Sequence, residues 1–262
     1  MKIALSIAYN GKHFSGWQKQ NKKYSSIQET IEDALSSIAN ENITTLCAGR
    51  TDAGTHATAQ IIHFETNKKR PMHAWTLGTN TKLPKNICIN WAKKVKNNFH
   101  ARFSAISRRY RYIIYNHLLR PSLFYNGIMH CKKKLSITNM QFAAQHLIGE
   151  KNFIAFKPSK CQSKTSWRRI HHIHINKINQ YIIIDIKANA FFHHMARNII
   201  GSLIEIGKGK QKKYWIQELL RAQNRSLAGP TAPSQGLYLV EVNYPKEFYL
   251  PITPIGPLFL NN

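Results

Sequence analysis

Two kinds of spacing between apolar residues mark the first elements of the chain. The segment "KIALSIAY" (2–9) alternates between apolar and polar residues and predicts a β-strand. Residues 25–40 predict a helix with Ser25 as its N-cap. The apolar positions of this helix recur at helical spacing: Ile27, Ile31, Ala34, Leu35 and Ile38.

The rest of the chain continues this pattern. Strands are expected at 43–49, 58–66, 86–95, 108–116 and 236–244, and two more within 166–190 around a turn at Asn179–Gln180. Helices are expected at 72–83, 139–149, 191–207 and 212–224. A strand–helix–strand–strand order recurs in the second part, which predicts an α+β fold with antiparallel sheets. A boundary near residue 105 would give two α+β halves, 1–105 and 106–262.

Charge narrows the class of partner. The chain has 38 Lys and Arg against 12 Asp and Glu, a formal charge of +26. Such an excess favours a polyanion, with nucleic acid first and an anionic membrane surface as the rival. Lys, Ile and Asn are abundant throughout, so part of the charge reflects general composition. No apolar run is long enough to span a bilayer and no signal peptide is evident, so a cytoplasmic protein with reduced thiols is expected.

The segment "AGRTDAGTHATAQ" (48–60) carries the first candidate chemistry. Asp52, one of only three aspartates, lies in a turn between Gly49 and Gly54, two residues after Arg50. One interpretation is a turn in which Asp52 caps local N–H groups. The other is an ionised carboxylate that acts as a nucleophile or base on a bound polyanion, kept charged by the neighbouring cation.

Metal chemistry is poorly supported by the sequence. His172 and His174 share a strand face and His193 and His194 follow a turn, but Cys161 is the only further candidate ligand nearby. Twelve acids also supply few carboxylates for a cage of oxygen ligands. We therefore expect no metal site.

Four segments together resemble one known family. They are "AGRTDAGTHA" (48–57), "FHARFSAISRRYRYIIYN" (99–116), "FFHHMARNIIGSLIEIG" (191–207) and "APSQGLYLVEVNYP" (232–245). In this order and over essentially the whole chain, they resemble the TruA type of tRNA pseudouridine synthases.

The resemblance implies a fold, an activity and a partner. The fold would be two similar α/β halves with a joined antiparallel sheet, flanked by helices, around a basic central cleft. The activity would be isomerisation of uridine to pseudouridine at positions thirty-eight to forty in the anticodon stem-loop of tRNA. No cofactor and no metal would be needed, and the protein would be a homodimer.

The resemblance also assigns residues. Asp52 matches the catalytic aspartate and Arg50 the arginine that displaces the target base. Tyr110 matches the tyrosine that packs on the target uracil, Arg197 the arginine that pairs with the catalytic carboxylate, and Leu237 an apolar pocket residue.

Basic and aromatic residues alternate in "SRRYRYIIYN", placing Arg109 and Arg111 on one strand face and Tyr110 and Tyr112 on the other. Such a strand could hold unstacked bases or be an ordinary edge strand with a basic outer face. We expect RNA contacts from four residues: Arg102, Arg108, Arg109 and Arg111.

Three residues depart from the family pattern: Thr55 and Ala196 stand where Val is usual, and Asn152 where Asp is favoured. None removes a catalytic group. The alternative function is a non-catalytic RNA-binding or RNA-chaperone protein, although an acid at the centre of an RNA site would weaken simple binding. A membrane-surface protein is disfavoured because helix 25–40 carries Glu29, Glu32 and Asp33 rather than a basic face.

Overall fold

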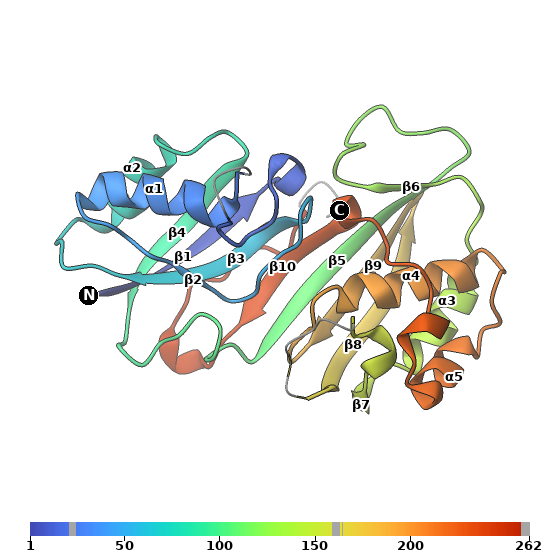
Figure 1. The fold of residues 1–262 in the computed structure, drawn as a ribbon. Helices are drawn as coiled ribbons and strands as arrows, with labels where there is room; N and C mark the ends of the chain where they lie inside the picture. Colours follow the sequence, from blue (N-terminus) through green and yellow to red (C-terminus); the bar gives the residue numbers. More distant parts are fainter. Residues whose placement is uncertain (21–24, 159–162, 164, 258–262) are drawn as a thin grey trace. The chain divides into compact units, whose positions relative to one another are not determined.

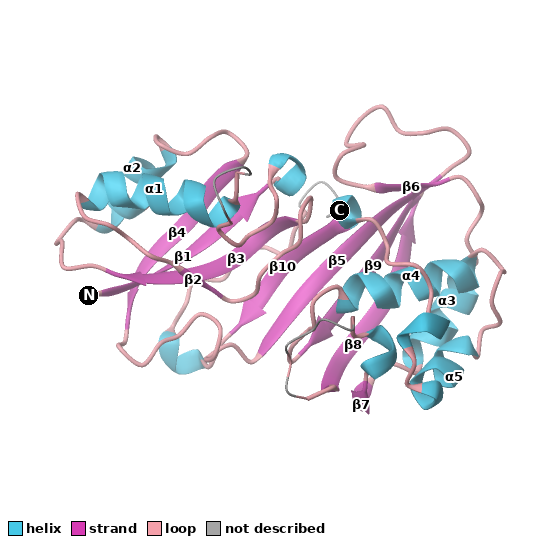
Figure 2. Cartoon of the chain, viewed as in Figure 1, coloured by secondary structure: helices cyan, strands magenta, loops and turns pink. Residues whose placement is uncertain are grey.

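The computed structural model describes residues 1–20, 25–158, 163 and 165–257 (Figure 1). The chain forms two compact units, Met1–Ile106 together with the residues from Tyr238 onward, and Ser107–Leu237. Each unit combines a sheet with helices, so the α+β class is confirmed (Figure 2). The half expected to span 106–262 thus ends in the structure at Leu237, because the residues after it pack with the first unit.

The first unit is built on a sheet with the strand order β4-β1-β3-β10, and β2 pairs with β3. Its strands are β1 (Lys2–Tyr9), β2 (Leu46–Cys47), β3 (His56–Glu65), β4 (Ile87–Val95) and β10 (Leu237–Asn243). β1 is antiparallel to both β3 and β4. β10 runs parallel to β3, with Tyr238 opposite His56, so this sheet is mixed rather than purely antiparallel as expected.

Two helices accompany this sheet, α1 (Ile27–Ala39) and α2 (Leu77–Asn80) (Figure 1). The α1 residues Ile27, Ile31 and Leu35 are fully buried, as their helical spacing predicts. The N-cap is Ser26 and not Ser25, because the Ser26 hydroxyl accepts the hydrogen bond from the backbone N–H of Glu29.

The second unit has the strand order β5-β9-β8-β7, with β6 parallel to β5 at its edge. Its strands are β5 (Ser107–Asn116), β6 (Met129–Cys131), β7 (Gly149–Asn152), β8 (Trp167–Ile178) and β9 (Tyr181–Ala188). The expected turn at Asn179–Gln180 joins β8 to β9, and Asn179 has a left-handed φ of 51°. The register places Asp185 on β9 beside Arg111 on β5 and His174 on β8.

Three helices pack in this unit: α3 (Ile137–Gln145), α4 (Met195–Gly207) and α5 (Trp215–Ala222). α3 contacts α4, α5 and strand β8. The Gln141 side chain attaches α3 to β8: its Oε1 accepts from Ile175 N at 2.7 Å, and its Nε2 donates to Ile173 O at 3.4 Å.

Element boundaries differ from the sequence-based ones where local geometry intervenes. The strand expected at 43–49 is reduced to Leu46–Cys47, and the helix expected to end at Gly149 ends at Gln145. The helix expected from 191 begins at Met195, because His194 adopts a left-handed φ of 61°. The segment 72–83 divides into a 3-10 helix and α2. Strands β6 and β7 are too short to produce a periodic signal and were not predicted.

Candidate active site

Asp52 lies in the turn between β2 and β3, as expected. Its backbone carbonyl accepts a hydrogen bond from Thr55 N at 3.1 Å, and Gly54 has a φ of +75°, which glycine adopts without strain. The Asp52 side chain is half-buried, while Arg50 at the start of the turn is exposed. Asp52 is therefore the first residue of a tight turn whose central residues are Ala53 and Gly54.

The N-terminal segment holds this turn from one side. A Cβ atom at Gly11 would lie 2.0 Å from the carbonyl oxygen of Thr55, and one at Gly16 would lie 2.8 Å from that of Thr51. Trp17, fully buried, donates its backbone N–H to Thr51 O at 3.0 Å. The glycines are thus required because two backbone segments touch here.

Side chains from two strands hold the same turn. The Tyr9 hydroxyl is 2.8 Å from Thr51 Oγ1, and Gln60 Nε2 donates to the carbonyl oxygen of Gly49 at 2.6 Å. Gly11 N donates to Nδ1 of the buried His56 at 3.2 Å. These contacts hold Gly49, Thr51 and His56, which lie before and after Asp52 in the sequence. They therefore fix the backbone that carries the Asp52 carboxylate. Sequence reasoning did not identify them, although Gly11 and Gly16 are a signal of close backbone approach.

The arginines predicted to contact RNA occupy different environments. Arg102 is exposed, and its guanidinium lies 5.5 Å from the ring centre of the exposed Phe103, an arrangement that resembles a stacking surface. Arg108 is only 9% exposed, and its Nη1 donates to the carbonyl oxygen of Asn189 at 3.1 Å. The Arg108 guanidinium therefore contacts the backbone of its own chain, and its contact with RNA stays a prediction.

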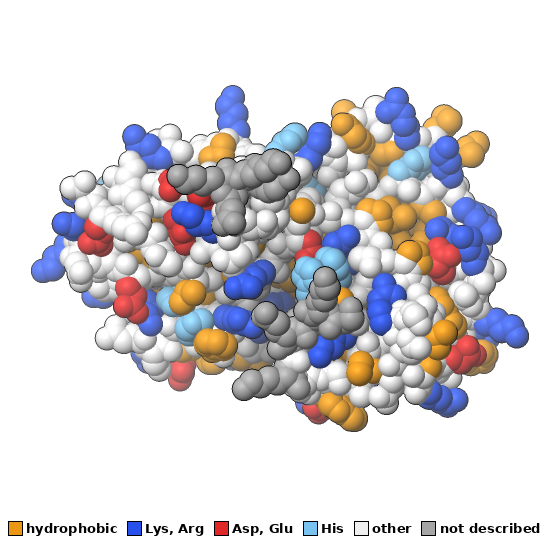
Figure 3. All heavy atoms as spheres, in the orientation of Figure 1, with side chains coloured by type: hydrophobic (Ala, Val, Ile, Leu, Met, Phe, Trp, Pro, Cys, Tyr) orange, Lys and Arg blue, Asp and Glu red, His pale blue; other side chains and the backbone are white. Residues whose placement is uncertain are grey.

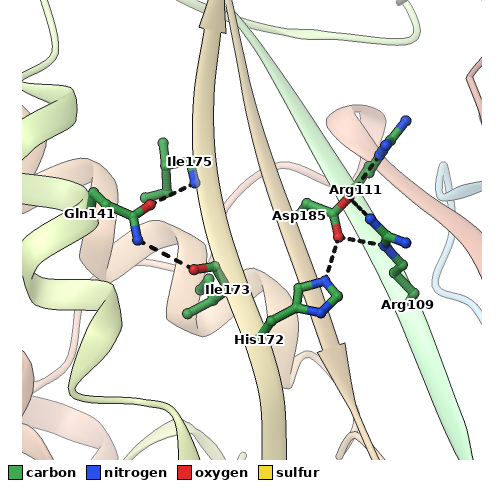
Figure 4. A network of polar contacts seen from close by, with 7 residues as sticks. All are labelled: Arg109, Arg111, Gln141, His172, Ile173, Ile175 and Asp185. Atoms are coloured by element: carbon green, nitrogen blue, oxygen red, sulfur yellow. Dashed lines mark hydrogen bonds and ion pairs between the residues drawn. The ribbon is translucent and has the colours of Figure 1, made fainter. Parts of the chain in front are cut away.

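Arg109 and Arg111 share one carboxylate, that of Asp185 (Figure 4). Arg109 forms a bidentate pair with it through Nε at 2.6 Å and Nη2 at 2.7 Å, and Arg111 Nε donates at 2.9 Å. His172 lies 3.0 Å away and must donate through Nε2, because an ionised carboxylate only accepts. The expected placement of both arginines on one face is thus confirmed.

Burial of Asp185 acts to raise the pKa of its carboxyl group, but the hydrogen bonds from Arg109, Arg111 and His172 outweigh that effect and lower the pKa to about 2. Both carboxylate oxygens are occupied by protein donors, so His172 and Asp185 belong to a hydrogen-bonded network with Arg109 and Arg111 rather than to a metal site. Cys161, the further ligand considered from sequence, lies outside the described residues.

Tyr110 belongs to the opposite face of β5. It is 8% exposed and makes an edge contact with Phe191, with ring centres 5.0 Å apart. Tyr112 on the same face is fully buried, and its hydroxyl donates to the carbonyl oxygen of Pro233 at 2.8 Å. The expected division of β5 into a basic face and an aromatic face is therefore confirmed.

Arg197 lies in the first turn of α4 and is half-buried. Its Nε donates to the carbonyl oxygen of Ala232 at 2.7 Å. Five residues later the chain reaches Leu237, which is 5% exposed and begins β10. The segment 232–237 therefore runs from Arg197 to β5, where Gly236 would carry its Cβ 2.9 Å from the Tyr112 ring. One short segment thus connects two of the predicted residues of this unit, Arg197 and Leu237.

Two departures from the family pattern have structural consequences. Thr55 is 1% exposed, and among the described residues its hydroxyl oxygen has no hydrogen-bond partner. Asn152 accepts from Ile154 N through Oδ1 and donates its amide to Gln223 Oε1 at 3.2 Å. An aspartate could make the first contact but could not donate in the second.

Charge over the molecule is strongly positive. Figure 3 shows Lys and Arg side chains over much of the visible face and few Asp and Glu. Between Glu65 and Glu150 the sequence contains no acid.

In the part of the chain that the structure describes, no helix is both long enough and apolar enough to cross a membrane.

Comparison with known proteins identifies the class. The family model described as tRNA pseudouridine synthase matches residues 5–104 and 143–245, which include Asp52, Arg197 and Leu237 but not Tyr110. A match over most of the chain defines an RNA-modifying isomerase that forms pseudouridine in tRNA.

Full-length relatives refine this class. The chain is 55% identical over 260 residues to tRNA pseudouridine synthase A of Vibrio atlanticus (strain LGP32), covering 99% of this chain and 98% of that protein. It is 55% identical over 262 residues to the protein of the same name from Haemophilus influenzae (strain ATCC 51907 / DSM 11121 / KW20 / Rd), covering 100% and 97%. The chain belongs to the tRNA pseudouridine synthase A family.

Among solved structures, one titled "Structure of H/ACA RNP bound to a substrate RNA containing 2'-deoxyuridine" aligns with a TM-score of 0.35 and 8% identity, covering 78% of this chain and 52% of that one.

Proposed function

We propose that this tRNA pseudouridine synthase isomerises uridines at positions thirty-eight to forty of the anticodon stem-loop, with Asp52 as its nucleophile or base. The observation that carries the proposal is the Asp52 turn, a carboxylate on a backbone fixed by Gly11, Gly16 and Tyr9 in a chain with very few acids. A rigid support is needed because catalysis requires the reacting group to be held in place before the substrate arrives.

The reaction exchanges one glycosidic bond for another. The bond from C1′ to N1 of uracil breaks, the ring turns, and C1′ bonds to C5, while C5 loses its proton and N1 gains one. The isomerisation is redox-neutral and adds no outside group. An ionised Asp52 can begin it by attacking C1′ or C6, or by removing the proton from C2′. These three possibilities share the carboxylate.

The other predicted residues would bind and enclose the uridine. Tyr110 would supply an aromatic ring and Leu237 an apolar wall for the detached base, and Arg197 would keep the Asp52 carboxylate ionised. Tyr110 and Leu237 are 8% and 5% exposed without RNA, so binding of the uridine would have to open access to both side chains. Flipping the target out of its stack costs a few kcal/mol. Phosphate contacts from basic residues such as Arg102 would supply this energy, because binding energy from remote parts of a substrate can be used at the reacting centre. Arg50 would displace the base.

Asp52→Asn tests this proposal. We expect pseudouridine formation to fall at least about 1,000-fold, because the amide cannot act as nucleophile or base. Binding of tRNA should survive, since the substitution removes one negative charge from a basic site. The assay maps pseudouridine in tRNA incubated with purified protein.

The matched control is Asp33→Asn, which removes an exposed acid of α1 in the same unit. It should leave turnover unchanged. Product formation by Asp52→Asn at the wild-type rate would refute the assigned role of Asp52, and product at uridines outside the anticodon stem-loop would refute the assigned target.

We further infer a cytoplasmic homodimer, as the family resemblance implies. Light scattering of the purified protein should give twice the chain mass of 30.2 kDa, and a monomer at working concentration would contradict this inference.

A further inference from the structure

The segment after α5 lies directly on α4. A Cβ atom at Gly201 would lie 1.7 Å from the carbonyl oxygen of Pro230, and one at Gly229 would lie 2.8 Å from the Cα of Ser202. Gly229 N also donates to the Ser202 hydroxyl at 3.0 Å. We call residues 225–232 the strap. Its backbone touches the helix without intervening side chains.

Arg225 closes the strap over the helix. Its Nη1 donates to the carbonyl oxygen of Gly229 at 3.0 Å and of Ala228 at 3.4 Å. Its Nη2 donates to Asn198 Oδ1 at 3.1 Å and to Thr231 Oγ1 at 3.3 Å. One guanidinium therefore connects the start of the strap, its end and α4.

Asn198 and Thr231 complete a closed triangle with Arg225. The Thr231 hydroxyl donates to Asn198 Oδ1 at 2.7 Å, and Asn198 Nδ2 donates to Phe156 O at 2.9 Å. Asn198 is 1% exposed, so losing a partner there would leave a buried polar atom unsatisfied. The four acceptors that Arg225 contacts in these bonds are neutral oxygens, and burial lowers its pKa. Its fan of donors is better suited to this task than the single ammonium of lysine.

The triangle is adjacent to a second contact between the same two elements, the one between Arg197 on the helix and Ala232 on the strap. Asn198 follows Arg197 on the helix, and Ala232 follows Thr231 on the strap. Ala232 N donates to Arg197 O at 3.1 Å, and Arg197 Nε donates to Ala232 O at 2.7 Å. The Nε hydrogen bond fixes the plane of the Arg197 guanidinium, and hence the direction in which its two amino groups point.

We propose that Arg225, acting through Asn198 and Thr231, is a positioning residue that orients the Arg197 guanidinium for the isomerisation. This rests on the role proposed for Arg197 above. The triangle fixes the strap, the strap fixes the Ala232 carbonyl, and that carbonyl fixes Arg197. Arg225 itself contacts no substrate in this scheme.

Two substitutions test the triangle, with Arg221→Ala as the matched control. Arg225→Ala removes all four contacts, and Thr231→Val removes the hydroxyl at nearly constant shape. Arg221 is an exposed arginine of the neighbouring α5. We expect kcat to fall about 100-fold for Arg225→Ala, the scale of a 1 Å misplacement, and about 10-fold for Thr231→Val. The KM for tRNA should stay within about twofold, since phosphate contacts are unchanged.

The pH profile separates positioning from simple loss of structure. A misdirected Arg197 no longer meets its proposed partner in the site in the same way, so the acid limb of kcat should shift in both variants, as it should in Arg197→Met. Loss of folded protein would lower the rate at every pH without moving the limb. Arg225→Lys, which can keep part of the triangle, should recover part of kcat. If Arg225→Ala does not fold, the kcat and the pH profile of Thr231→Val decide whether the positioning role is correct.

The outcomes distinguish this inference from the proposed function. If Arg197→Met lowers kcat but Arg225→Ala and Thr231→Val leave kcat and the acid limb unchanged, the positioning role is wrong and the proposed function stands. If Arg197→Met leaves kcat unchanged, the role given to Arg197 is wrong, and the positioning role is wrong with it.

Discussion

At the scale of single residues, Asp185 is a buried acid whose carboxylate is paired within the fold. It is one of three aspartates, and the other two are exposed or half-buried, whereas Asp185 is 6% exposed. Arg109, Arg111 and His172 compensate for its burial across three strands. The sequence could have singled out Asp185 by rarity alone, but only the register of β5, β9 and β8 brings these partners together.

Asp185→Asn should destabilise the protein in a pH-dependent manner. The pKa of Asp185 is lowered from an ordinary 3.8 to about 2, so its stabilisation is complete above pH 4 and is lost as the pH falls through 2. The shift corresponds to about 2 kcal/mol at neutral pH. Urea unfolding at several pH values should show this difference and its decrease in acid. An equal free energy of unfolding for variant and wild type at pH 7 would contradict the network.

Thr55→Val should stabilise the protein. The Thr55 hydroxyl is buried under the Asp52 turn with no hydrogen-bond partner among the described residues, and valine has nearly the same shape. Removing an unsatisfied buried hydroxyl should raise the free energy of unfolding by about 1 kcal/mol. Thermal unfolding and turnover should be measured together. A lower melting temperature would show that the hydroxyl has a partner in solution.

At the scale of elements, the irregular segments between strands and helices, more than the strands themselves, fix the positions of Asp52 and Arg197. The β2–β3 turn carries Asp52, yet its shape depends on a segment about 40 residues earlier, where Gly11 and Gly16 meet Thr55 and Thr51. In the second unit, the strap fixes the position of Arg197 in our proposal, just as the segment with Gly11 and Gly16 fixes the backbone of the Asp52 turn. Both are irregular segments fixed by glycines and side-chain hydrogen bonds, which periodic patterns do not report.

Gly11→Ala should therefore impair turnover. Its methyl group would lie 2.0 Å from the Thr55 carbonyl oxygen, so the Asp52 turn must shift. We expect kcat to fall about 100-fold, the cost of a displacement near 1 Å, with little change in KM. Gly78→Ala is the control, because a Cβ there meets its nearest atom at 3.5 Å and α2 should gain stability. Wild-type turnover in Gly11→Ala would show that the turn is not fixed by this contact.

At the scale of the whole molecule, charge is the dominant property. A formal charge of +26 and a stretch from 66 to 149 without an acid give a molecule that attracts tRNA from a distance. Arg109 and Arg111 are paired with Asp185, and Arg108 donates to the backbone of Asn189, so these three arginines also have contacts within the protein. We expect exposed residues such as Arg102 to contribute to the attraction, as proposed above.

Binding of tRNA should weaken steeply with salt. Each phosphate neutralised by Lys or Arg releases counterions, so the affinity should fall about 1,000-fold between roughly 50 and 200 mM salt if six or more phosphates are contacted. Filter binding across this range gives the slope. Arg102→Ala should make the slope shallower by about one contact, and Asp33→Asn should not. A flat titration would contradict a phosphate-dominated interface.

The sequence by itself determined the α+β class, most elements, the positive charge and the glycine-flanked Asp52 turn. Periodicity and turn chemistry are local properties, and they were sufficient for β1, β5 and α1. The tertiary structure alone decided that the residues after Leu237 pack with the first unit, that Asp185 pairs with Arg109 and Arg111, and that Arg225 reaches Asn198. Each of these joins residues at least 25 positions apart, and spacing along the chain carries no information on which distant segments will meet.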